Sequence, residues 1–234
     1  MSDKSEWSKL SIDKKIGTQI EAWTGNPNEE KKPFITISRE FGSEGWIIGQ
    51  RVEEIINKEN DFHPPWVAYN KEILNKLEEN ENLSKELVES LEKPAGGAIN
   101  TFIDNFFRNK PVRISIFKKT ARVIKALASN GHVIIVGRGG CFITHEMKNG
   151  FHVRIVAQMD WRIRNIMKQQ NLSQSESEKL VKQMENERDA FIKDYFFTEV
   201  SDPHYYDLVI NTSRFSIDEA AELIIFSMQK RGLI

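Results

Sequence analysis

Short apolar runs alternate with longer amphipathic stretches along this sequence. Five runs are rich in β-branched and aromatic residues: Phe34–Ser38, Trp66–Tyr69, His132–Val136, Phe151–Ala157 and Leu208–Ile210. The run His132–Val136 (HVIIV) is apolar at nearly every position, which is typical of a strand buried on both faces. Each run is predicted to be a strand, and the polar, glycine-bearing segments that follow several of them predict turns.

The intervals between these runs carry apolar residues at helical spacing. Three stripes are present: Ile48, Val52, Ile55 and Ile56; Phe117, Ala121, Ile124 and Ala128; and Ile217, Ala220, Ala221, Ile224 and Met228. Ser173 with Glu176, and Ser216 with Glu219, have the spacing of helix-starting capping boxes. Strands that alternate with helices predict an α/β fold whose parallel sheet is covered on both faces.

The N-terminal segment differs from the rest. Residues 1 to about 32 are polar apart from Ile16, Ile20 and Trp23, which lie at helical spacing, and Gly25–Pro33 has the composition of a linker. We therefore expect a helical extension and linker over residues 1–32, followed by one α/β domain over residues 33–234.

Composition and charge limit the classes of function. The chain has 234 residues, enough for one α/β domain with a small insertion, and its formal net charge is −1. A strongly basic field that would favour a nucleic acid polymer is missing. No run approaches the roughly 18 apolar residues of a membrane span, and the first residues lack the apolar core of a signal peptide, so we expect a cytoplasmic protein with no membrane partner. The single cysteine, Cys141, excludes an intrachain disulfide.

Parallel sheets bind ligands at the carboxyl ends of their strands, which directs attention to the loops after the predicted strands. The loop Ser38–Gly49 lies between a strand and a helix, where backbone N–H groups and the helix dipole would face an anion. It lacks the lysine of a Walker motif. On the motif alone, an ordinary glycine-rich turn stays open as the alternative.

Basic residues follow two further strands. Arg138 lies in the turn Gly137–Gly140, where it could grip a phosphate or stand as a surface arginine on a tight turn. Arg162 and Arg164 follow the fourth strand, and Arg188 and Lys193 lie on a later helix. These four could offset phosphoryl charge, or form a solvated helix face paired with Glu185 and Glu187. Arg188 and Lys193 are five positions apart, so they would not share one helical face.

Four ordered segments resemble the cytidylate kinase-like family. Its typical motifs I-T-I-S-R-E-x-G-S-G-G, Y/F-D-x-E-I-L, V-I-V-G-R-G and D-P-x-x-Y-D-L-V-I-N-T correspond here to ITISREFGSEG, YNKEIL, IIVGRGG and DPHYYDLVINT. The resemblance extends from Phe34 to Ile234. It implies a three-layer P-loop kinase fold with a five-stranded parallel sheet, helices on both faces, a monophosphate-binding insertion over about residues 70–112 and a lid over about residues 186–206.

The resemblance also implies transfer of the γ-phosphoryl group of ATP to CMP or dCMP, with Mg²⁺. Carried onto this sequence, it assigns ATP-phosphate binding to Gly42, Ser43 and Gly45, with Ser43 as a candidate Mg²⁺ ligand; monophosphate binding to Tyr69, Lys71 and Arg138; catalysis to Arg39, Arg188 and Lys193; and the lid to Arg162, Arg164 and Asp202.

Three departures from the family motifs favour a second interpretation. Glu44 replaces a glycine in the phosphate loop, Trp46 stands where many members have a polar or basic residue, and Asn70 replaces an aspartate. A catalytically impaired nucleotide-binding protein with a sensing role is therefore the alternative. The stripe of Ile16, Ile20 and Trp23 adds the hypothesis of a homo-oligomer formed through the N-terminal helix.

Overall fold

A computed structural model describes residue 7 and residues 10–25, 32–79 and 114–234. Its sheet has five parallel strands in the order β2-β3-β1-β4-β5. These are β1 (Phe34–Arg39), β2 (Val67–Tyr69), β3 (Val133–Val136), β4 (Gly150–Val156) and β5 (Leu208–Asn211). All five predicted strands are confirmed, with small shifts at their ends.

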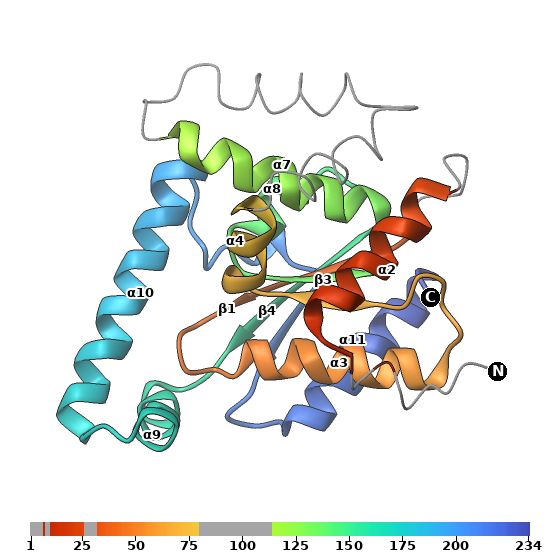
Figure 1. The fold of residues 1–234 in the computed structure, drawn as a ribbon. Coiled ribbons are helices and arrows are strands. Elements are labelled where there is room, and N and C mark those ends of the chain that lie inside the picture. Colours follow the sequence, from red (N-terminus) through yellow and green to blue (C-terminus); the bar gives the residue numbers. More distant parts are fainter. Residues whose placement is uncertain (1–6, 8–9, 26–31, 80–113) are drawn as a thin grey trace.

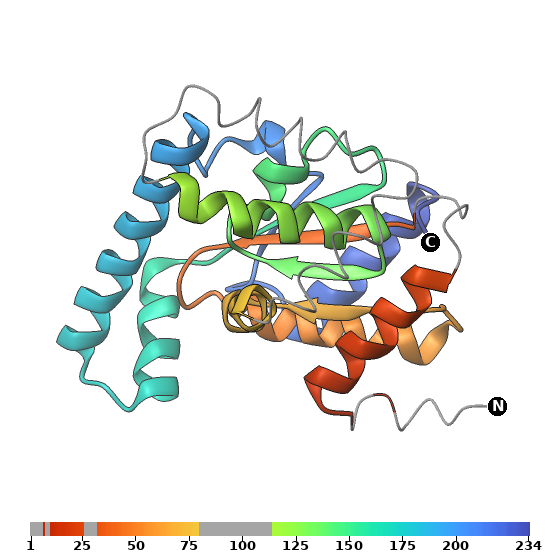
Figure 2. The same cartoon turned by 45° about the horizontal axis from the view of Figure 1, so that its top comes forward.

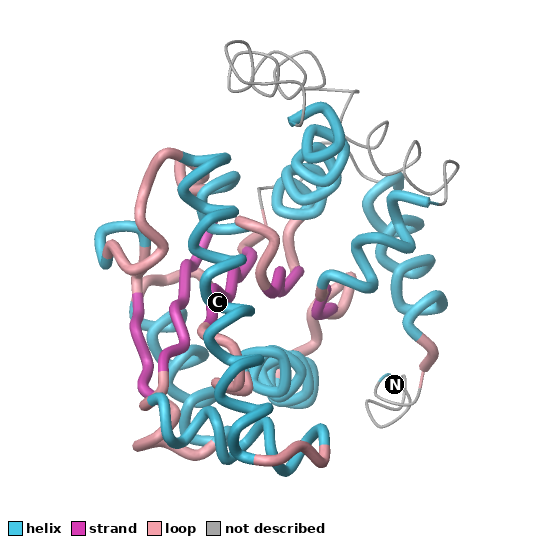
Figure 3. Tube along the Cα trace, turned by 90° about the vertical axis from the view of Figure 1, so that its left-hand side faces the viewer, coloured by secondary structure: helices cyan, strands magenta, loops and turns pink. Residues whose placement is uncertain are grey.

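Helices cover both faces of the sheet (Figures 1 and 3). One face carries α3 (Gly45–Glu59) and α11 (Ile217–Lys230), and the other carries α7 (Ile114–Asn130) and the short α8 (Gly140–Thr144). Successive residues of a strand point to opposite faces, so Ile134 and Val136 pack towards α3 while Val133 and Ile135 pack towards α7. This burial on both faces explains the continuous HVIIV run. The expected three-layer α/β fold, with a five-stranded parallel sheet and helices on both faces, is what the chain adopts.

The N-terminal helix α2 (Ile12–Gly25) packs into the core of the same chain. Ile16, Ile20 and Trp23 are all buried against residues such as Phe34 and Val67. The apolar stripe is therefore covered within the chain itself, and a homo-oligomer formed through the N-terminal helix stays a prediction. Most of the predicted linker lies outside the described residues.

Three further helices frame the carboxyl end of the sheet. The helix α4 (Lys71–Glu79) begins the predicted insertion, whose residues 80–112 lie outside the described part of the chain. The helices α9 (Met159–Gln170) and α10 (Gln174–Phe196) form an antiparallel hairpin, and α10 runs along one side of the molecule (Figures 1 and 2). The predicted lid begins in the last turns of α10 and includes the 3₁₀ turn Pro203–Tyr205.

Local signals in the sequence fix several helix ends. Both predicted capping boxes are present, with Ser173 starting α10 and Ser216 starting α11.

No helix in the described ranges is long and apolar enough to cross a bilayer.

Candidate active site

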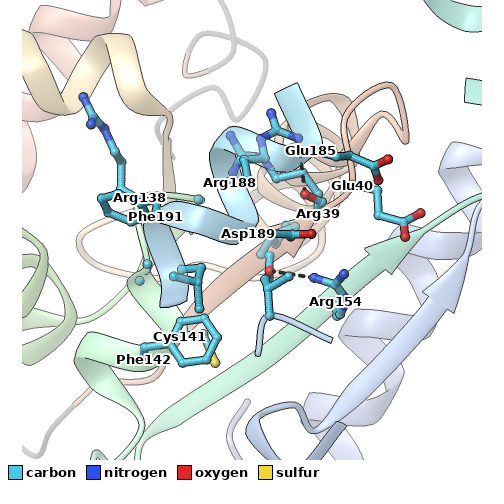
Figure 4. A pocket seen from close by; sticks show the side chains of 17 residues that line it. Arg39, Glu40, Arg138, Cys141, Phe142, Arg154, Glu185, Arg188, Asp189 and Phe191 are labelled. Atoms are coloured by element: carbon cyan, nitrogen blue, oxygen red, sulfur yellow. Dashed lines mark hydrogen bonds between the residues drawn. The ribbon is translucent and has the colours of Figure 1, made fainter. Parts of the chain in front are cut away.

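A partly enclosed pocket lies at the carboxyl end of β1, between the turn 137–140, β4 and α10 (Figure 4). Its volume is about 70 Å³, which is room for a few water molecules. Basic side chains from four elements line it: Arg39 from β1, Arg138 from the turn after β3, Arg154 from β4 and Arg188 from α10. The carboxylates on its wall belong to Glu40, Glu185 and Asp189.

The Arg39 side chain extends from Gly45, in the loop predicted to bind phosphates, to Gly137 in the turn after β3. A methyl group built on Gly45 would lie 2.8 Å from Arg39 Cβ, and one on Gly137 would collide with Arg39 Nη1. Glycine at these two positions therefore makes room for the whole length of the arginine. The guanidinium has no hydrogen bond or ion pair to any described residue. Burial, and then the charges of Arg188 and Arg138, lower the pKa of Arg39 to about 9.

Arg188 reaches the same place from α10. Its Nη1 donates to the Arg39 carbonyl at 3.4 Å, and its guanidinium lies 5.2 Å from the centre of the Phe41 ring. Burial lowers the pKa of Arg188, with Glu185 opposing this and Arg162 adding to it. An anion placed between Arg39 and Arg188 would relieve the repulsion between them.

Arg138 is held by an unusual backbone. Gly137, Arg138 and Gly139 have φ angles of 86°, 53° and 68°, so a non-glycine residue occupies the left-handed region at the rim of the pocket. Such strain persists where the surrounding structure enforces it, and it is common at functional sites. Asn75 of α4 accepts a 2.6 Å hydrogen bond from Arg138 Nη2.

Arg162 has a structural position, contrary to its expected role as a lid cation. It is 4% exposed and lies 2.6 Å from Glu185 Oε1 and 3.5 Å from Glu40 Oε2. It also donates to the carbonyls of Ala157 and Phe41. Arg162 therefore connects the loop after β1 to α10 and neutralises two of the three carboxylates of the pocket.

The three residues expected to cradle ATP phosphates are packed against protein atoms. A methyl group on Gly42 would lie 3.0 Å from the Arg162 carbonyl, and Gly45 faces Arg39. Ser43 is 0% exposed, and its Oγ donates to the Glu40 carbonyl at 2.9 Å. The Ser43 hydroxyl does not fit a Mg²⁺ ligand, because it points into the loop. Among the described residues no cluster of His, Cys, Asp or Glu could hold a metal ion.

The remaining predicted residues lie away from the pocket. Tyr69 is fully buried and donates to Gln19 Oε1 at 2.6 Å, so it does not face a monophosphate site. Lys71 and Arg164 are exposed on α4 and α9. Lys193 lies on the outer face of α10, 3.6 Å from Glu199, as its spacing from Arg188 indicated. Asp202 accepts from the His204 N–H and starts the 3₁₀ turn.

Two departures from the family motifs have a local explanation. Glu44 has φ 63° and precedes the first residue of α3, a position where glycine costs least. Burial raises the pKa of its carboxyl group. Asn70 accepts a hydrogen bond from the Ile73 N–H at 3.0 Å, so it starts α4 as an aspartate would.

The sequence prediction missed four charged residues of the pocket: Glu40, Arg154, Glu185 and Asp189. Only Arg154 gave a usable signal. It interrupts the apolar run Phe151–Ala157, and a charge inside a buried strand needs a partner or a ligand. The three carboxylates look like ordinary polar residues of a loop and a charged helix.

The fold and the site together define a class of protein. A five-stranded parallel sheet has a glycine-bearing loop between its first strand and a helix, and arginines gather near the carboxyl ends of its strands, where α/β proteins bind their ligands. Residues 34–214 match the cytidylate kinase-like family, and the chain belongs to that family. It is a nucleoside-monophosphate-kinase-like protein.

Individual relatives are distant. A cytidylate kinase of Sulfolobus acidocaldarius is 24% identical over 131 residues, which are 56% of this chain and 67% of the relative. The crystal structure of an uncharacterized protein from Eubacterium ventriosum is 22% identical, covers 86% of this chain and 100% of its own, and superposes with a TM-score of 0.67. The second comparison shows the shared fold.

Proposed function

We propose that this protein transfers the γ-phosphoryl group of ATP to a pyrimidine nucleoside monophosphate, CMP or dCMP. The observation that carries the proposal is the convergence of Arg39 and Arg188, neither of which has an ion pair among the described residues, on a pocket at the carboxyl end of β1. Membership of the cytidylate kinase-like family supports the choice of nucleotide.

The chemistry assigned to these residues is electrostatic. The transferred phosphoryl group carries spread negative charge in its transition state, and pre-positioned arginines stabilise that charge without a covalent intermediate. Arg39 and Arg188 would contact the transferred group, and Arg138, held by Asn75, would contact the acceptor phosphate. Mg²⁺ would arrive with the ATP phosphates and neutralise part of their charge; no protein ligand for it is assigned.

The test is ADP release from ATP in the presence of CMP, dCMP, UMP or AMP. We expect turnover with the cytidine nucleotides, and a loss of about a hundredfold or more in kcat for Arg188→Met. Arg51→Met is the matched control, because Arg51 pairs with Glu54 and Asp218 on the surface of α3. Absence of turnover with every acceptor, in protein shown to be folded, would remove the proposal.

The second candidate is a nucleotide-binding protein with impaired catalysis. The position of Arg39 favours it, because this side chain lies along Gly45 and Gly137 on the side of the loop where a triphosphate would be wrapped. Calorimetry would separate the two: ATP or CMP binding without ADP release supports the second candidate. No affinity for either nucleotide excludes both.

A further inference from the structure

Two buried arginines near the pocket have opposite surroundings. Arg162 is 4% exposed and Arg154 is 7% exposed. Arg162 has two carboxylates and two carbonyls as partners. Arg154 has no ion pair to any residue that the structure describes, and its partners are the Ser38 hydroxyl at 3.3 Å and the ring of Tyr206. A buried charge without a directly bonded counter-ion is costly, and a ligand can compensate it.

The surroundings of Arg154 are built to present donors. Ser38 and Arg154 are register partners on adjacent strands, on the same face of the sheet. Ser38 Oγ accepts from Arg154 Nη1 at 3.3 Å and lies 3.2 Å from the Tyr206 hydroxyl, whose own hydrogen is donated to the Val200 carbonyl at 2.8 Å. The Ser38 hydroxyl hydrogen can therefore point either to Tyr206 Oη or into the pocket, because a hydroxyl rotates to suit its acceptor. Both Ser38 and Arg154 line the pocket.

Arg138 and Arg154 stand on opposite sides of β1. The strand order β3-β1-β4 places the turn after β3 on one side and β4 on the other. Figure 4 shows the two arginines at opposite ends of the pocket, with Arg39, Arg188 and Asp189 between them. The pocket thus has two cationic ends.

We propose that Arg154 and Ser38 form a phosphate-binding position of their own, at the end of the pocket opposite Arg138. The Arg154 guanidinium and the Ser38 hydroxyl donate to the oxygens of one phosphoryl group of a bound nucleotide, and Tyr206 fixes both donors. The assignment rests on the proposed function for the identity of the ligand, since a phosphotransferase must hold two phosphate-bearing molecules at once. It does not rest on turnover.

The main competing explanation is that Asp189 serves as the counter-ion of Arg154. Asp189 lies on the wall of the same pocket, and the Arg154 charge acts against the burial that raises the Asp189 pKa, but no ion pair within 4.0 Å joins the two side chains. Under the proposal Asp189 repels an incoming phosphate, so Asp189→Asn strengthens the binding of inorganic tripolyphosphate. Weaker tripolyphosphate binding by Asp189→Asn would overturn the assignment.

The experiment compares Arg154→Met with Arg162→Met in the full chain. Thermal unfolding midpoints are measured with and without tripolyphosphate, and affinities by calorimetry. Without the anion, Arg154→Met unfolds at the same or a higher temperature than the parent chain, because an uncompensated charge is removed. Its affinity for tripolyphosphate falls by about tenfold or more. Arg162→Met, which leaves two carboxylates without their cation, unfolds at a lower temperature.

Several outcomes overturn the assignment. If the thermal unfolding midpoint of Arg154→Met falls as that of Arg162→Met does, Arg154 stabilises the fold and is not a ligand-binding residue. Arg154→Met that keeps its affinity for tripolyphosphate shows that the phosphate binds elsewhere. Arg154→Lys keeps the charge with fewer donors, and we expect it to stay as stable as the parent and to bind the anion with intermediate affinity.

The same data separate this inference from the proposed function. Binding of tripolyphosphate that depends on Arg154, in a chain without turnover, supports the position and sinks phosphoryl transfer. Turnover of CMP by Arg154→Met with unchanged kcat and KM supports phosphoryl transfer and sinks the position.

Discussion

At the scale of single residues, Glu44 occupies a strained backbone position whose cost in stability can be measured. Its φ of 63° lies in the left-handed region, which costs a non-glycine residue about 1 kcal/mol. We expect Glu44→Gly to raise the free energy of unfolding by roughly 0.5–1 kcal/mol in urea titrations. Glu44→Ala removes the same charge but keeps the strained conformation. Equal gains in both variants would show that charge, not backbone conformation, sets the cost.

His152 gives a pH dependence with a definite sign. It lies on β4, where Thr36 Oγ1 is 2.7 Å from its Nδ1. Burial lowers the pKa of His152 to about 4; the charges of His145 and Arg231 act in the same direction, and Asp207 opposes them. Between pH 6.5 and about 4 the unfolded chain binds a proton that the folded chain does not. The free energy of unfolding therefore falls as the pH drops through this window, by roughly 2–3 kcal/mol in total.

The measurement is urea unfolding at several pH values between 7 and 4. His152→Asn should flatten the decline, whereas His204→Asn should leave it unchanged, because the His204 side chain is 91% exposed. Identical slopes in the two variants would assign the acid sensitivity to other groups.

The residue scale is also where sequence reasoning was weakest. The position of each arginine in the chain was visible, but the direction of its side chain was not. Arg162 and Arg164 were grouped as lid cations, yet one is buried between two carboxylates and the other is exposed on α9. Burial and partners, which depend on the packing of α9 against α10, decide the difference. Arg154 could have been found, because it is a charge within an apolar strand.

At the scale of elements, the sequence predicted the fold well because each element has a local cause. Strands with apolar residues on both faces, and capping boxes at Ser173 and Ser216, are properties of neighbouring residues. The docking of α2 was not predictable in this way. Its polar residue Gln19 is fully buried, where it donates to the carbonyls of Pro65 and His132 and accepts from the Tyr69 hydroxyl.

Gln19 supplies a test of how α2 is attached. Gln19→Ala would leave the Tyr69 hydroxyl and the Pro65 carbonyl without a partner, while the His132 carbonyl keeps the Val67 N–H, so we expect a loss of roughly 2–4 kcal/mol in the free energy of unfolding. Thr18→Ala, next to it on the exposed face, removes only a hydrogen bond to the Lys14 carbonyl and should cost about 0.5 kcal/mol or less. Comparable losses in the two variants in urea titrations would mean that α2 contributes little to the folded core.

The Arg162–Glu185 ion pair, which joins α9 to α10, allows a second test at this scale. Arg162–Glu185 and Lys182–Glu178 are both ion pairs with a 2.6 Å contact, but the first is buried and the second exposed. Removing the cation should cost about 3–5 kcal/mol for Arg162→Met and less than about 1 kcal/mol for Lys182→Met. The difference, measured by urea unfolding, should persist in high salt, since burial protects the first pair from screening. Similar losses for both would show that Arg162 is solvated.

At the scale of the whole molecule, the pocket is too small to hold a nucleotide while α10 covers it. A volume of about 70 Å³ is well below that of pockets that hold small molecules, which run from roughly 300 Å³ upwards. The cover is α10, whose residue Phe196 packs on Phe142 with ring centres 5.1 Å apart. A methyl group on Gly139 would lie 2.6 Å from the Phe196 ring. Entry of the proposed nucleotide substrate would therefore require the carboxyl end of α10 to move away from the turn 137–140.

The contacts of Phe196 should then limit the rate of entry. Only the fraction of molecules with α10 displaced can bind, and weakening the closed state raises that fraction. We expect Phe196→Ala to increase the association rate of a fluorescent ATP analogue by about three- to tenfold in stopped-flow experiments, while the free energy of unfolding falls by about 2–4 kcal/mol. Phe197→Ala is the control, because Phe197 is 71% exposed. A Phe196→Ala chain that is folded and binds at the parent rate would show that the nucleotide enters by a path that α10 does not cover.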